Sequence, residues 1–93
     1  MELSQIRLQI DEVDNELVRL FERRMRLSAE VAEYKRENGL PVLDQKREEQ
    51  LLDRIEGMSD VELAAHTRKL YATILSLSRE YQQEKLDGAE VSK

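Results

Sequence analysis

Residues 3–35 read LSQIRLQIDEVDNELVRLFERRMRLSAEVAEYK, and this stretch decides the fold. Its apolar side chains recur every three or four residues, which is typical of a helix that buries one stripe against other helices. The stripe comprises Leu3, Ile6, Ile10, Val13, Leu17, Leu20, Leu27, Val31 and Tyr34. An arginine, Arg24, occupies the position that would complete the rhythm. Because an unpaired buried charge costs several kcal/mol, we expect Arg24 to meet an anion inside the helical assembly.

The composition is that of a small, soluble helical domain. Hydrophobic residues make up 40% of the 93 positions and charged residues 38%, with one proline and three glycines, which predicts a single all-α domain. The chain has no cysteine, so disulfide and thiolate chemistry are excluded. The first turn is charged and no stretch approaches the ~20 apolar residues of a membrane span, so we expect a cytoplasmic protein without membrane contact. A net charge of −5, with acidic and basic residues interleaved, argues against a nucleic-acid partner.

Stop and start signals divide the chain into a long, a short and a medium helix. The long helix is predicted at about 3–38, because an Asn-Gly pair at 38–39 supplies a left-handed cap and Pro41 cannot continue the helix. The short helix is predicted at about 45–57, with Asp44 as its N-cap and a glycine at its end.

The third helix is predicted at about 60–86. The segment Ser59–Glu62 has the pattern of a capping box, with a serine followed by a glutamate three residues later. These helices form one predicted domain over residues 1–86. Residues 87–93 are expected to form a flexible C-terminal tail.

The length of the first helix predicts an oligomer. At ~1.5 Å per residue it is ~50 Å long, whereas a compact chain of this size has a radius of gyration near ~12 Å. Two shorter helices cannot cover an apolar stripe of that length, and a soluble monomer rarely exposes so much apolar surface. We therefore expect an intertwined homodimeric helical bundle, with the long helices packed antiparallel.

Polar side chains occur beside the apolar stripes of all three helices. Arg24 and Lys35 share one face of the first helix with Ser28 and Val31, and their long side chains could grip one small anion. Each of the other helices carries a polar pair at i, i+4: Asp44 and Glu48 on the second, Ser78 and Gln82 on the third. A protein carboxylate as the partner of Arg24, and a mere N-cap role for Asp44, remain alternatives. No histidine and cysteine cluster is present, so no metal site is expected.

Arg7 also flanks the stripe of the first helix. It lies 17 residues before Arg24, which is ~25 Å along a straight helix, too far for one small molecule to span. In an antiparallel dimer, Arg7 of one protomer can approach the Arg24 and Lys35 region of the other. The spacing therefore predicts a site shared between two protomers.

The pattern resembles the all-helical bacterial chorismate mutases over nearly the whole chain, about residues 3–83. Taken singly the matching segments are weak, but six of them in order, with two short joints between helices, are highly specific. They are residues 3–7, 10–14 with Leu17, 22–24, 31–35, 41–44 with 47–48, and 78–82. Members of this family occur as free-standing enzymes and as domains of bifunctional proteins of aromatic biosynthesis, and both alternatives stay open.

The resemblance implies roles for the cations and the amide. Arg7 matches an arginine that reaches into the partner's site, and Arg24 an arginine of the same chain; both are implied to bind substrate carboxylates. Lys35 matches a lysine that contacts the ether oxygen and a carboxylate. Gln82 matches a glutamine that donates a hydrogen bond to the same ether oxygen.

Three further residues carry implied roles. Asp44 matches an aspartate of the pocket, Glu48 a glutamate that accepts the ring hydroxyl, and Ser78 a serine beside a carboxylate. Arg47 precedes the glutamate as in the family pattern, and we interpret it as structural. The residues implied to act in catalysis itself are Lys35, Gln82, Arg24 and Glu48.

The implied reaction is the rearrangement of chorismate to prephenate in the shikimate pathway to phenylalanine and tyrosine. This pericyclic isomerisation needs no nucleophile, metal or other cofactor, in keeping with a chain without cysteine. One alternative is an isochorismate–pyruvate lyase of the same fold, although Asp44, Glu48 and Ser78 favour the mutase. The other is a non-catalytic domain that binds a regulatory ligand or only dimerises.

Overall fold

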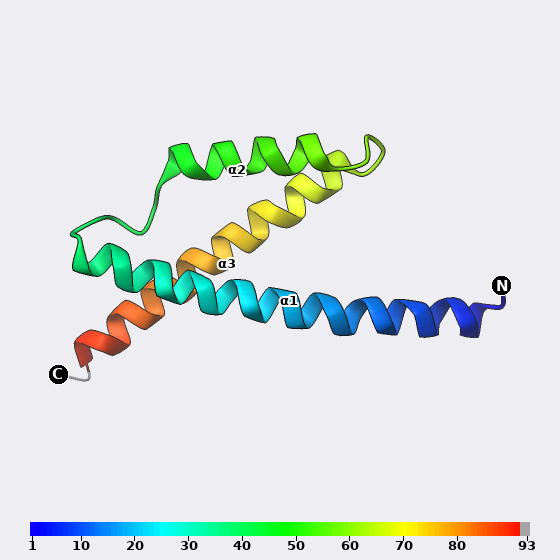
Figure 1. Ribbon diagram of the computed structural model, residues 1–93, viewed down its shortest axis with the longest axis horizontal. Coiled ribbons are helices and arrows are strands. Elements are labelled where there is room, and N and C mark those ends of the chain that lie inside the picture. The colour runs from blue at the N-terminus through cyan, green and yellow to red at the C-terminus, as the bar shows by residue number, and fades with distance from the viewer. Residues whose placement is uncertain (92–93) are drawn as a thin grey trace.

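The computed structural model describes residues 1–91 and is all-helical over that range (Figure 1). It contains α1 (Leu3–Glu37), α2 (Gln45–Met58) and α3 (Ala64–Val91). The predicted fold class, with one long, one short and one medium helix, is therefore confirmed. The chain is elongated, with a radius of gyration of 16.7 Å and a longest extent of 56 Å. None of the described helices is long and apolar enough to cross a membrane.

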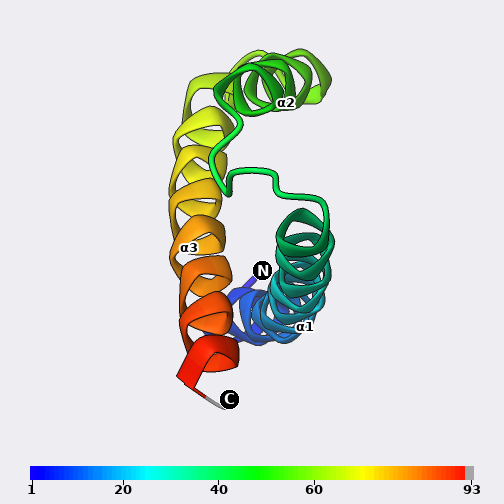
Figure 2. The same ribbon diagram turned by 90° about the vertical axis from the view of Figure 1, so that its left-hand side faces the viewer.

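Helix α3 holds the other two helices together. The first part of α3 packs against α2, and its later part crosses α1 near the C-terminal part of α1. Helices α1 and α2 are held apart from each other (Figures 1 and 2). The apolar core lies between α2 and α3 and consists of Leu51, Ile55 and Leu75, with Leu52 and Tyr71 packed against it. The result is an open frame, with the α1–α2 connection closing one side.

The predicted ends of the first two helices agree with the structure to within one residue. The chain leaves α1 through Gly39, whose φ of +64° is the left-handed conformation expected from the Asn-Gly pair. Asp44 is the N-cap of α2, and its side chain accepts a hydrogen bond from the backbone N–H of Arg47 at 3.1 Å.

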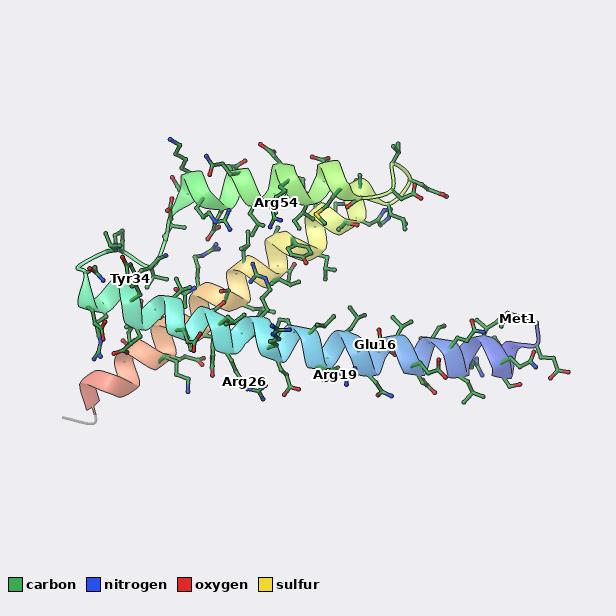
Figure 3. All side chains as sticks on the ribbon, in the orientation of Figure 1. Met1, Glu16, Arg19, Arg26, Tyr34 and Arg54 are labelled. Carbon is green, nitrogen blue, oxygen red and sulfur yellow. The ribbon has the colours of Figure 1, made fainter. Side chains whose placement is uncertain are left out.

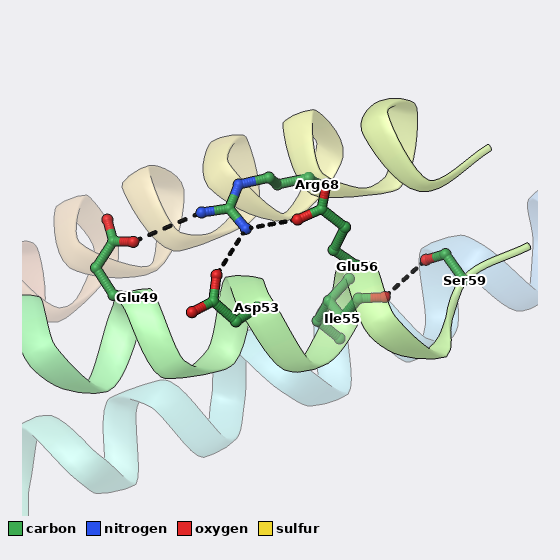
Figure 4. A network of polar contacts seen from close by, with 6 residues as sticks. All are labelled: Glu49, Asp53, Ile55, Glu56, Ser59 and Arg68. Atoms are coloured by element: carbon green, nitrogen blue, oxygen red, sulfur yellow. Dashed lines mark hydrogen bonds and ion pairs between the residues drawn. The ribbon is translucent and has the colours of Figure 1, made fainter. Parts of the chain in front are cut away.

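The predicted start of the third helix was wrong. Ser59 is the C-cap of α2 and does not cap α3, and its hydroxyl donates to the carbonyl of Ile55 at 2.7 Å (Figure 4). The following turn is held by Asp60, whose side chain accepts from the backbone N–H of Glu62 at 3.2 Å. Helix α3 therefore begins at Ala64. A serine hydroxyl can bond backward or forward along the chain, and here the backward bond prevails.

The predicted boundary between the third helix and a flexible tail was also wrong. Helix α3 continues through position 87 to Val91, and residues 92–93 lie outside the described residues. The side chain of Gln83 donates to Asp87 at 3.0 Å, one helical turn further on, which supports this extension.

A cluster of charges joins α3 to α2. Arg68 on α3 contacts Glu49, Asp53 and Glu56 on α2, with N–O distances of 3.5, 3.0 and 3.0 Å (Figure 4). The hydrogen bond that the Arg68 guanidinium donates to Asp53 is the main reason that the pKa of Arg68 is raised above its usual value. A raised pKa means that the folded chain favours the charged guanidinium, so this contribution to stability is lost only at extreme alkaline pH.

Replacing Arg68 with methionine should lower the melting temperature, because three carboxylates on one face of α2 then lose their shared cation. The difference from the wild-type protein should shrink as NaCl is raised, since the three carboxylates are 46–72% exposed to solvent. Thermal melts followed by circular dichroism at low and high salt measure both effects. A difference that is independent of salt would assign the loss to packing of the arginine stem.

Within residues 1–91, no other helix lies beside the N-terminal half of α1 (Figure 3, from Met1 to Glu16). The apolar stripe predicted from the sequence runs the length of α1, and its first members lie along this uncovered half. Its exposed members include Leu3, Ile6, Ile10, Val13 and Leu17, with exposed fractions between 41% and 59%.

Candidate active site

A pocket of about 290 Å³ opens where α1, α3 and the start of α2 converge. Six of the seven residues assigned to a site from the sequence line it: Arg24, Lys35, Asp44, Glu48, Ser78 and Gln82. The seventh, Arg7, is exposed near the N-terminal end of α1 and does not line the pocket.

Each helix positions its site residues through its own periodicity. Arg24 and Lys35 project from the same face of α1, with Ser28 between them, as their spacing of three helical turns predicts. Ser78 and Gln82 face them from α3, because α3 crosses α1 at this level. The connection after Gly39 then turns the first residues of α2 toward the same space.

The two cations that α1 contributes to the pocket, Arg24 and Lys35, have no carboxylate partner among the described residues. The guanidinium of Arg24 lies 5.9 Å from the ring centre of Tyr71, a cation–π contact. The ammonium of Lys35 donates to the backbone carbonyl of Val42 at 2.7 Å. By contrast, the ion pairs of the described residues engage Arg26, Arg36, Arg68 and Arg79.

The protein carboxylate considered as a partner for Arg24 is therefore absent from the described part of this chain. Arg24 and Lys35 are both only half-buried, so water solvates them in part. Their side chains converge on a pocket that an anion can enter.

A chain of hydrogen bonds crosses from α3 to α1 at the back of the pocket. The side-chain amide of Gln82 donates to Ser78 at 3.2 Å, Ser78 donates to Ser28 at 2.7 Å, and Ser28 donates to the backbone carbonyl of Arg24 at 3.1 Å. All three side chains are buried, with exposed fractions of 5–8%. A carbonyl can only accept, so each hydroxyl hydrogen must point toward α1, which fixes the direction of the whole chain.

This direction determines how the amide of Gln82 is turned. Its nitrogen must face Ser78, which leaves the second N–H hydrogen for another acceptor. Its carbonyl oxygen is buried and has no hydrogen-bond partner in the described structure. A buried polar group without a partner is costly, so the amide is suited to meet polar groups of a bound molecule.

Replacing Ser28 with alanine removes the acceptor of the Ser78 hydroxyl and lets that hydroxyl turn. We expect a loss of stability of about 2 kcal/mol, because the hydrogen bonds of Ser28 with Ser78 and with the Arg24 carbonyl are both lost and each contributes about 1 kcal/mol. Urea unfolding of the variant and of the wild-type protein measures this change. Thr73→Ala is a matched control, because Thr73 makes the same bond to a carbonyl one turn earlier but is exposed. Equal losses of stability from both substitutions would contradict this expectation.

The two carboxylates of the pocket are held differently. Asp44 is exposed and engaged as the N-cap of α2, so the N-cap alternative is correct for its contacts within the chain. Glu48 is half-buried and forms an ion pair with Arg79 of α3. The pocket is therefore lined by the cations of Arg24 and Lys35 and by the carboxylate of Glu48, which Arg79 holds.

Sequence reasoning missed four contributors to the pocket. Ser28 was placed on the correct face but given no role, although its i, i+4 relation to Arg24 was a usable signal. Tyr71 and the carbonyl of Val42 support the cations from other elements. Arg79 is adjacent to Ser78 in sequence and pairs with a residue 31 positions away, so no local pattern indicated it.

No three His, Asp or Glu side chains of the described residues are grouped so that they could hold a metal ion. The donors that line the pocket are mainly guanidinium, ammonium, hydroxyl and amide groups. Such groups recognise carboxylates and other oxygen-bearing anions through charge-assisted hydrogen bonds.

The fold and the pocket together define a small all-helical protein whose pocket is lined by guanidinium, ammonium, hydroxyl, amide and carboxylate groups. The chain belongs to the chorismate mutase type II family, which matches residues 6–83. This membership confirms the resemblance found in the sequence, and the matched range includes all seven site residues.

One relative is a protein of Methanocaldococcus jannaschii named chorismate mutase. It is 43% identical over 53 residues, which correspond to 57% of this chain and 54% of the relative. The match thus covers about half the length of that curated relative. No solved structure matches the chain.

Proposed function

We propose that this chain is a chorismate mutase, an isomerase that rearranges chorismate to prephenate on the route to phenylalanine and tyrosine. The observation that carries the proposal is the pocket pair Arg24 and Lys35, which have no carboxylate partner among the described residues. Half-buried cations without a carboxylate partner favour an anionic ligand. Membership of the family supports a dicarboxylate as that anion. A cytoplasmic location is part of the same proposal.

The first task of the site is to hold the compact form of the substrate. The flexible enolpyruvyl arm must lie over the ring before the rearrangement can occur, and fixing it there removes an entropic part of the barrier. We assign this task to Arg24 and to Arg7 of the partner subunit, each gripping one carboxylate. Planar guanidinium groups suit this task because they bind carboxylates with two parallel hydrogen bonds.

The second task is to stabilise the negative charge that grows on the ether oxygen as its bond to the ring breaks. Lys35 supplies a full positive charge there, and only one of its three N–H donors is used by Val42. Gln82 supplies the N–H hydrogen that is not used by Ser78. Because both donors are held before the reaction, they stabilise the transition state more than the substrate.

The remaining polar residues complete the proposed site. Glu48 accepts the ring hydroxyl of the substrate, and Asp44 lies at the pocket rim beside it. Ser78 can donate to a substrate carboxylate only by turning its hydroxyl hydrogen away from Ser28. We therefore expect Ser78 to contribute less to turnover than Lys35.

We propose further that the active protein is an antiparallel homodimer. The uncovered apolar half of α1 supports this assembly, because a second α1 would bury that stripe. The same packing would carry Arg7 toward the partner's Arg24 and Lys35. Light scattering at micromolar protein concentration tests the assembly, and a monomer would contradict it.

The decisive experiment on activity is to add the purified protein to chorismate and follow the loss of chorismate absorbance together with prephenate formation. Prephenate formation at an enzymatic rate supports the mutase. Salicylate and pyruvate formed from isochorismate instead would indicate the lyase. Thermal stabilisation by a bicyclic dicarboxylate that mimics the transition state, without turnover of either substrate, would indicate a binding domain.

A further inference from the structure

The ion pair between Glu48 and Arg79 has no role in the function proposed so far. The pair links the first turn of α2 to α3 at the edge of the pocket. Both side chains are partly shielded from solvent, with exposed fractions of 22% for Glu48 and 35% for Arg79. Both residues also line a neighbouring hollow beside Leu43 and Gln45. The pair thus forms part of the wall between the pocket and that hollow.

The pair engages one side of the carboxylate. Arg79 donates through Nη1 to Oε1 of Glu48, and the other carboxylate oxygen, Oε2, has no hydrogen bond or ion pair in the described structure. A glutamate side chain has three rotatable bonds, and fixing them from solution costs conformational entropy. Because Arg79 already binds Oε1, the Glu48 side chain is ordered before any ligand binds. Oε2 remains available as an acceptor.

We propose that Arg79 is a positioning residue, which holds Glu48 so that its second oxygen accepts the ring hydroxyl of the substrate. This inference rests on the proposed mutase function and assigns Arg79 a share in substrate selectivity. Arg79 acts through Glu48, so its effect should appear in the preference for ligands that carry the hydroxyl. Hydrogen bonds to charged groups are strong enough for that preference to be about tenfold or more.

The test uses two bicyclic dicarboxylates, one with and one without the hydroxyl that corresponds to the substrate's ring hydroxyl. Their affinities for the full-length wild-type protein and the Arg79→Met variant are measured by calorimetry. We expect the ratio of the two affinities to fall by about tenfold in the variant, because Glu48 is no longer held. With chorismate, the variant should show a raised KM and a smaller change in kcat, because the hydroxyl contact is already present in the bound substrate.

Three further variants separate positioning from other roles. Arg79→Lys keeps a cation within reach of Glu48 and should restore most of the preference for the hydroxyl. In a Glu48→Ala background, Arg79→Met should leave the ratio unchanged, because the carboxylate through which Arg79 acts is already removed. Arg26→Met is the matched control, since Arg26 forms an ion pair with Glu22 on an exposed face of α1, away from the pocket (Figure 3).

An equal loss of affinity for both ligands in Arg79→Met would mean that Arg79 acts only through its charge or by holding α2 to α3, and it would overturn the inference. So would a further change in the ratio in the Glu48→Ala background. If Arg79→Met does not fold, the Arg79→Lys result decides, and a lost preference in that folded variant overturns the inference. Failure of the mutase proposal is recognised separately, since the wild-type protein would then neither convert chorismate nor bind either dicarboxylate.

Discussion

Lys35→Ala is expected to lower kcat by about a hundred- to a thousand-fold, the loss that follows removal of one preplaced donor from a developing negative charge. Lys35 is the only full charge that we assign to the ether oxygen, and the Val42 carbonyl holds it in place before the reaction. The remaining donor, Gln82, is neutral. KM should change less than kcat, because charge on the ether oxygen grows mainly in the transition state.

The matched variant is Ser78→Ala. Ser78 has its hydroxyl hydrogen directed to Ser28 rather than toward the pocket, so we expect its removal to reduce kcat by no more than about tenfold. Circular dichroism and light scattering on both variants verify that fold and assembly are retained. Small and equal losses for Lys35→Ala and Ser78→Ala would refute the assignment of Lys35 to the ether oxygen.

Mixing two inactive variants is expected to restore activity. In the proposed dimer each site takes Arg7 from one protomer and Lys35 from the other, so Arg7→Ala and Lys35→Ala homodimers each lack a residue in both sites. A heterodimer of the two variants has one complete site and one that lacks both residues. With random exchange of equal amounts, half of the dimers are mixed, and about a quarter of wild-type activity should return.

This complementation distinguishes a shared site from one built within a single chain. If Arg7 acted on the pocket of its own chain, neither site of the mixed dimer would be complete and no activity would return. The protomers must be unfolded together and refolded so that they exchange, and a wild-type sample treated in the same way gives the reference. Arg26→Met mixed with Lys35→Ala is the control, because Arg26 does not line the pocket.

Local signals predicted much of the fold because the forces behind them are local. An Asn-Gly pair and an N-cap aspartate act within one turn, and the structure has Gly39 and Asp44 in those conformations. The convergence of Arg24 and Lys35 on one pocket followed from helical periodicity alone. Ser59 shows the limit of such signals, since the same hydroxyl could bond to either of two helices.

Other features depend on the way the helices cross. Tyr71 meets Arg24, and Ser78 meets Ser28, only because α3 crosses α1 at that level. Arg79 stands next to Ser78 in the sequence, yet its partner lies on α2. No spacing rule within one helix reaches such partners, so these contacts required the structure.

The bond from Lys35 to the carbonyl of Val42 has a consequence for how the protein can evolve. Every amino acid offers a backbone carbonyl, so position 42 can change its side chain without removing this anchor. The contact between Arg79 and Glu48, in contrast, needs two particular side chains at once. Position 42 can therefore vary during evolution without loss of the contact that holds Lys35. Arg79 and Glu48 must instead be retained together if their contact is to be kept.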